Sequence, residues 1–224
     1  MRAVILALAA VAGWLDGLTF VALGSVFVSA VTGDLVQVGI AAADGDGARL
    51  LILVTALAAF VAGTSLAVTL VRAVGTMAWP GPVRRPLLVH AGLLILFAVM
   101  WTAAGDPERG SAGAVAVVGI AAFSAGVQGA AILGLGISGA TVNAVTGVLM
   151  LLGAGLAERG VGVPGPRPAL PWWELGLILG VYSISGLVVA LAFSGEGRVL
   201  AWIPALLALA VLGLVPRRAS VPDP

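Results

Sequence analysis

Two aspartates lie among residues that otherwise suit hydrocarbon, Asp16 within GWLDGLTF and Asp34 within GSVFVSAVTGDLVQVG. An acid inside an apolar segment is costly and is by default a candidate functional residue. Asp34 directly follows a Thr-Gly pair, Thr32 and Gly33. If a helix begins at Gly33, Thr32 is a suitable N-cap, and the dipole and free amides of the first turn favour an ionised Asp34. These residues could bind a cationic or protic group, or carry a proton.

The Thr-Gly pattern occurs twice. VSAVTGDLVQVG aligns without gaps with VNAVTGVLMLLG at 142–153, so Thr146 and Gly147 begin a second predicted half-helix. Val148 stands at the place of Asp34, which leaves the second helix start free for an anionic or electron-rich group. The asymmetry suits a substrate with one positive or protic end and one acceptor end, or an acid that couples protons to transport.

Two amides complete the set of candidate binding residues. Gln128, within FSAGVQGAA, lies near the place equivalent to Asp16, and Asn143 precedes Thr146 by three residues. The plainer interpretation is structural, because polar residues and small-residue spacings such as Gly13 to Gly17 commonly serve helix packing in membranes.

The elements that must position these residues are transmembrane helices. The chain is 61% hydrophobic and 9% charged, and long apolar runs alternate with short Arg-, Asp- and Pro-bearing loops, which is typical of a polytopic membrane protein. The second and sixth runs are too short to span comfortably at 1.5 Å per residue. The apolar runs fall at about 2–23, 26–43, 49–72, 86–104, 112–137, 139–157, 172–194 and 198–215.

Arginines in the loops favour six crossings over eight. With eight, the count is seven arginines inside and four outside, whereas with six and two re-entrant segments it is eight and three. We therefore predict an all-α protein with six transmembrane helices, two Thr-Gly half-helices and both termini in the cytoplasm. Three crossings per half make the duplication a 3+3 inverted repeat. Its halves are 1–105 and 106–216, followed by a short polar tail at 217–224.

Composition excludes several classes of function. There is no cysteine, a single histidine (His90), no paired-acid or Ser/His constellation and no GxxxxGK[ST] loop. We therefore expect no enzyme activity, no metal and no cofactor. The net charge of +1 gives no reason to expect nucleic acid. His90 and the PWWE group around Glu174 are expected near the membrane interfaces.

The quoted motifs, together with GVQGAAILGLGISGATVNAVTG, resemble the YoaK family of bacterial inner-membrane proteins over almost the whole chain. The family carries an N-terminal Gly-aromatic-x-Asp, a Thr-Gly-Asn after a Phe, and a second Thr-Gly after an Asn. The resemblance implies about six transmembrane helices, an inner-membrane location and no assigned biochemical activity. Asp34 replaces the family's usual asparagine, which leaves Asp16 the stronger candidate for an ionisable role.

The leading hypothesis is a small-molecule permease or exporter that works by alternating access, with its site between the two half-helix starts at mid-membrane. A channel-like pore and a scaffold or assembly partner are the alternatives. The expected partners are the lipid bilayer and an unidentified substrate, and a homo-oligomer is left open.

Overall fold

The computed structural model describes residues 2–72, 81–105, 107–108, 110–133, 147–154, 170–193 and 197–215. Every regular element in these ranges is a helix, which confirms the all-α class. The helices are α1 (Arg2–Leu23), α2 (Thr32–Asp44), α3 (Gly47–Arg72), α4 (Gly81–Ala104), α5 (Ala112–Leu133), α7 (Trp172–Ala192) and α8 (Trp202–Leu214), with a further helical stretch at 147–154.

Five of these helices are long and apolar enough to cross a membrane, namely α1, α3, α4, α5 and α7. The apolar α8 is shorter, with 13 residues. α2 also has 13 residues, which at 1.5 Å each is about 20 Å and well short of a bilayer core. The second apolar run is therefore a short helix preceded by an irregular segment, as the sequence predicts, while six crossings stay a prediction.

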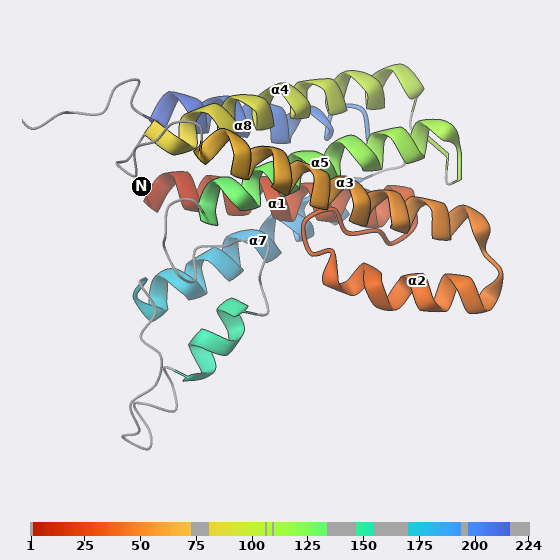
Figure 1. Ribbon diagram of the computed structural model, residues 1–224, viewed down its shortest axis with the longest axis horizontal. Coiled ribbons are helices and arrows are strands. Elements are labelled where there is room, and N and C mark those ends of the chain that lie inside the picture. Colours follow the sequence, from red (N-terminus) through yellow and green to blue (C-terminus); the bar gives the residue numbers. More distant parts are fainter. Residues whose placement is uncertain are drawn as a thin grey trace, which may run out of the picture.

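The helices run back and forth along the long axis of the molecule (Figure 1). α1, α4 and α7 lead from left to right in that view, and α3, α5 and α8 return. The contacts agree: Trp202 at the start of α8 donates from its indole nitrogen to Thr102 at the end of α4, 3.2 Å away. Gln128 late in α5 reaches Leu8 early in α1.

Two parallel helix pairs are held together by glycines. In α1 and α7 a Cβ at Gly13 would overlap the carbonyl of Tyr182, and Gly17 faces Gly186 one turn later. In α3 and α5 a Cβ at Gly63 would overlap the carbonyl of Phe123. Only a residue without a side chain permits so close an approach, which is the small-residue packing expected between membrane helices.

The two short helical elements belong to different buried clusters, and α2 packs against α3. Ala41 of α2 belongs to a buried cluster with Leu15, Leu18 and Leu23. Val148, in the stretch 147–154, belongs to another with Val4, Ile5 and Leu8. Figure 1 shows α2 and the teal stretch 147–154 toward opposite ends of the molecule.

His90 corrects one expectation. It is fully buried in α4, not at an interface, and its Nδ1 lies 2.8 Å from the Ser124 hydroxyl and 3.0 Å from the Ser124 carbonyl in α5. His90 does not lie near a helix end as the apolar run suggested, because α4 begins at Gly81 and places His90 more than two turns inside the helix.

Candidate functional site

Asp16 is the centre of the most extensive polar cluster in the described residues. Its Oδ1 accepts the backbone N–H groups of Val28 and Ser29, both at 2.7 Å. Its Oδ2 accepts the Ser29 hydroxyl at 2.6 Å, the Ala30 N–H at 3.1 Å and the Tyr182 hydroxyl at 2.5 Å. Five donors and no acceptor surround the carboxylate, which is the pattern that fits its ionised form.

Asp34 extends the cluster from the first turn of α2. Its Oδ1 accepts the Phe27 N–H at 3.2 Å and the Gln37 side-chain amide at 3.0 Å. Four consecutive amides, those of residues 27–30, are thus held by two carboxylates. Oδ2 of Asp34 is buried and lacks a partner in the described part of the chain.

These bonds explain how an irregular segment lies beside a membrane helix. Residues 24–31, here called the bridging loop, leave α1 through left-handed backbone at Gly24 and Ser25, with φ of 100° and 64°. The loop then lies alongside the last turns of α1, next to Asp16. Non-helical backbone at such depth is tolerated only when its polar groups are satisfied by protein or water. Here the two acids supply the acceptors.

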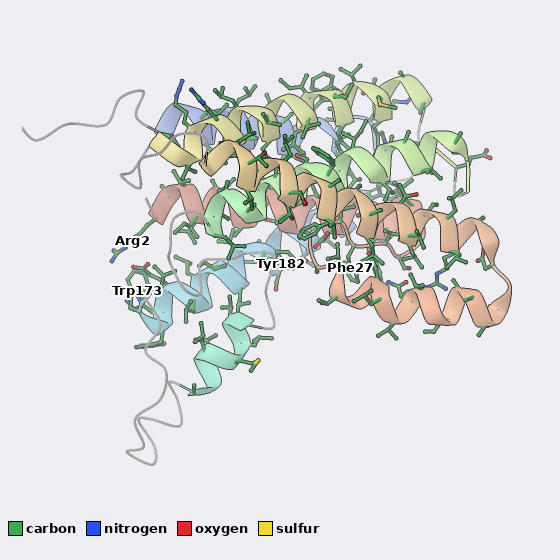
Figure 2. The ribbon with its side chains drawn as sticks, in the orientation of Figure 1. Arg2, Phe27, Trp173 and Tyr182 are labelled. Carbon is green, nitrogen blue, oxygen red and sulfur yellow. The ribbon has the colours of Figure 1, made fainter. Side chains whose placement is uncertain are left out.

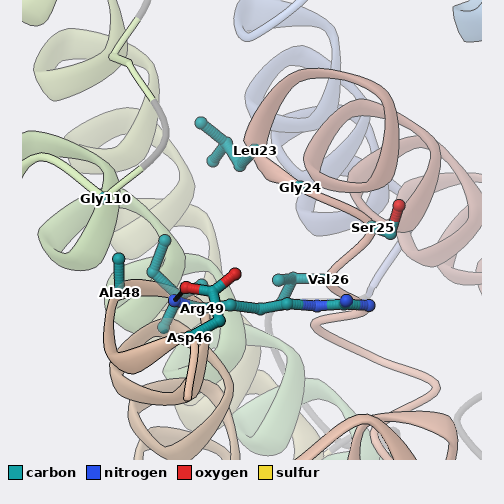
Figure 3. Close-up of a pocket in the computed structure, with 9 residues that line it drawn as sticks. Leu23, Gly24, Ser25, Val26, Asp46, Ala48, Arg49 and Gly110 are labelled. Atoms are coloured by element: carbon teal, nitrogen blue, oxygen red, sulfur yellow. Dashed lines mark hydrogen bonds between the residues drawn. The ribbon is translucent and has the colours of Figure 1, made fainter. Parts of the chain in front are cut away.

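A polar chain connects this cluster to the start of α3. The Gln37 amide also donates to the carbonyl of Ser25 at 2.9 Å, and its oxygen accepts a 2.7 Å bond from Arg49. Arg49 lines a cavity of about 270 Å³ between the α1 end, the α3 start and Gly110 (Figure 3). In the same view, Asp46 caps α3 by accepting the Arg49 backbone N–H at 3.0 Å.

A second hollow, of about 240 Å³, opens beside Asp16 between α1, the bridging loop and α7. We call it the α1–α7 hollow. Its lining includes Asp16, Tyr182, Phe20, Phe27 and Ser183. Tyr182 and Phe27, labelled in Figure 2, bring α7 and the loop to the same central region. The hollow arises because Gly17 and Gly186 present no side chains where the two helices meet.

Asp34 lies in α2, outside the membrane-spanning helices. Burial raises the pKa of its carboxyl to about 7, against the lowering effect of the Phe27 N–H and with a smaller contribution from the charge of Asp16. A carboxyl with this pKa exchanges its proton near neutral pH.

The predicted site residues divide into three groups. Asp16 and Asp34 are brought together by the bridging loop. Gln128 lies apart, donating to the carbonyl of Leu8 at 2.9 Å, with its own oxygen buried and unpartnered among the described residues. Thr32 and Gly33 are exposed, as is Gly147, while Asn143 and Thr146 lie outside the described residues.

The predicted capping role of Thr32 is wrong. α2 begins at Thr32 itself, the preceding Val31 makes no side-chain cap, and the first amides are satisfied by backbone. The N–H groups of Gly33 and Asp34 donate to the carbonyls of Ala30 and Val31, each at 3.2 Å. A tight backbone turn before the helix thus replaces the side-chain cap.

Comparison with known proteins confirms the family. The model of a family described as "Protein of unknown function (DUF1275)" matches residues 4–214. The chain belongs to this family. It is also 26% identical over 202 residues to UPF0700 transmembrane protein YoaK of Bacillus subtilis (strain 168), covering 90% of this chain and 88% of that protein. No solved structure matches the chain significantly.

Two residues of this DUF1275 chain were missed by sequence reasoning. Ser29 and Tyr182 both donate to Asp16, and Tyr182 stands 166 residues away in sequence. Tyr182 is the only tyrosine in the chain, and a buried tyrosine hydroxyl needs a hydrogen-bond partner. A single tyrosine within an apolar segment was therefore a signal that a polar partner lies nearby. Ser29 sits among apolar residues and gave no comparable signal.

Proposed function

We propose that this protein is a small-molecule carrier of the bacterial inner membrane, with its termini in the cytoplasm and its substrate site at the α1–α7 hollow beside the start of α2. The observation that carries the proposal is a buried Asp16 that accepts five hydrogen bonds and lines a hollow large enough for a small molecule. Ionisable groups inside membrane helices mark substrate and ion pathways, and carriers commonly place such sites beside broken helices.

The inverted repeat that the sequence predicts would fit this proposal. A twofold axis in the membrane plane would exchange α1 with α5 and α3 with α7, and would therefore exchange the pair α1–α7 with the pair α5–α3. Both pairs are parallel and both are closed by glycines against backbone carbonyls. The short elements α2 and 147–154 lie toward opposite ends of the molecule, as two half-helices entering from opposite faces would.

Proton coupling has a candidate in Asp34, whose Oδ2 is free to take a proton without breaking a bond. The charged groups around it are Asp16 on α1 and, through Gln37, Arg49 on α3. Protonation of Asp34 would leave a single negative charge in the cluster.

A scaffold is the second candidate, since the five donors on Asp16 also tie α1, the bridging loop and α7 into one unit. Flux into liposomes separates the hypotheses. The purified protein is reconstituted and screened with a metabolite library under an imposed proton gradient. Saturable flux is expected from a carrier, whereas unsaturable flux would favour a pore, and no flux for any compound would favour the scaffold.

Ala190→Phe provides the matched test of the site. Ala190 is exposed and lines the hollow, so a phenyl ring there occupies the space without removing any hydrogen-bonding group of the Asp16 cluster. Leu187→Phe, at an exposed position on α7 outside the lining, is the control. We expect flux to fall at least about tenfold in Ala190→Phe only, and equal flux in both variants would contradict a site at the hollow.

A further inference from the structure

We propose that the α1–α7 hollow binds a hydrophobic organic cation, a compact ammonium ion with apolar substituents. This inference names a substrate class for the proposed carrier. Transport of such an ion across the membrane rests on the proposed function, whereas binding of the ion in the hollow does not.

Asp16, whose five donors fit an ionised carboxylate, has no cationic side chain in direct contact among the described residues. The donors that reach Asp16 and Asp34 among the described residues are backbone amides, Ser29, Tyr182 and Gln37, all of them neutral. Arg49 reaches the cluster only through Gln37. A cation in the hollow would therefore meet an attractive field that the surrounding low dielectric strengthens.

The hydrogen-bonding groups of the hollow are already occupied. Both oxygens of Asp16 accept protein donors, and the Tyr182 hydroxyl donates to Asp16. Apart from Ser183, the other side chains of the lining are aromatic, aliphatic or absent. A sugar or a free amino acid would leave most of its polar groups unpaired there, which is costly in an apolar site. The occupant must carry charge without demanding many hydrogen bonds.

Aromatic rings supply a favourable surface for such an ion. Phe20 and Phe27 stand with ring centroids 5.0 Å apart and planes tilted by 33°, and both line the hollow with Tyr182. Quaternary and alkylated ammonium ions are attracted to the faces of aromatic rings. The volume of about 240 Å³ accommodates a single ring bearing a trimethylammonium group.

The test uses phenyltrimethylammonium as the probe and benzenesulfonate as its anionic counterpart. Binding of each to the full-length protein in nanodiscs is measured by equilibrium dialysis, with empty nanodiscs subtracted. We expect saturable binding of the cation and none of the anion. Phe20→Leu keeps the apolar volume but removes a ring, and we expect it to weaken cation binding about fivefold to tenfold.

Two variants locate the bound ion. Ala190→Phe should abolish binding by filling the hollow, and Leu187→Phe should leave it unchanged. Binding that survives Ala190→Phe, equal binding of both probes, or an unchanged affinity in Phe20→Leu would each overturn the inference. Saturable flux of some other compound, blocked by Ala190→Phe while phenyltrimethylammonium fails to bind, would reject the substrate class and leave the carrier function standing.

Discussion

The helix pairs α1–α7 and α3–α5 use the same packing device and differ in what stands beside it. Both run parallel with glycine against backbone, at Gly13 in one pair and at Gly63 and Gly126 in the other. Beside the first lie Asp16, Tyr182 and an open hollow. Beside the second lie Ser124 and Gln128, both buried.

The difference separates two consequences of small residues in a membrane. In α3–α5, Gly63 and Gly126 each meet a backbone carbonyl of the other helix, and Gln128 makes a single bond to α1. In α1–α7, contact is tight at Gly13 and still close at Gly17, where a Cβ would lie 3.0 Å from the Gly186 Cα. It relaxes at Gly186, where a Cβ would meet only the Gly13 carbonyl at 3.7 Å. Glycine therefore permits both a close backbone contact and an open hollow beside it.

The largest expected loss of stability comes from substituting the polar residues beside the two helix pairs. Asp16→Ala removes the acceptor for three backbone amides and two hydroxyls. At about 1–3 kcal/mol for each buried orphan, the loss is comparable to the whole stability of a domain. Gln128→Ala loses one bond and should cost about 1–3 kcal/mol. Thermal melts in detergent compare them, and similar melting temperatures for the two variants would contradict the distinction.

An intermediate loss of stability is expected from substituting the glycines that both helix pairs pack against backbone carbonyls. Gly13→Ala and Gly63→Ala each place a methyl group on a backbone carbonyl, which cannot move aside, so both should cost about 3 kcal/mol. Gly180→Ala on α7 is the control because a Cβ there meets no atom within 4 Å. The control should melt like the wild type. If Gly13→Ala alone were harmless, α1–α7 would not be a tight pair.

The smallest expected effect is the pH dependence of stability that comes from Asp34. The pKa of Asp34 is raised from its ordinary value near 4 to about 7 in the folded protein, so the protonated carboxyl stabilises the fold. This stabilisation is fully present below about pH 4 and is lost as the pH rises through 7. Wild type should lose about 2 kcal/mol between pH 5 and pH 8. Asp34→Asn keeps the bond from Phe27 and should lose less over the same range. Parallel pH profiles of the melting temperature would contradict a buried, titrating Asp34.

Local sequence was sufficient to predict the helices and to single out Asp16 and Asp34 as candidate functional residues. Long apolar runs specify membrane-length helices because hydrocarbon requires every backbone group to be bonded within its own segment. The Thr-Gly step correctly predicted a short helix with Asp34 in its first turn and Gln37 one turn on. The Thr32 cap failed, because a backbone turn can satisfy the same amides equally well.

The sequence by itself determined an all-helical membrane chain of this family, with two acids and two short Thr-Gly elements, since hydropathy and spacing are local properties. Only the tertiary structure decided that the bridging loop folds back onto Asp16, that Tyr182 completes its coordination from α7, and that a hollow opens there. The physical reason is that apolar, glycine-rich helices present nearly interchangeable faces to one another. Which faces meet depends on packing and on polar groups far apart in the chain, and these act only once the helices have assembled.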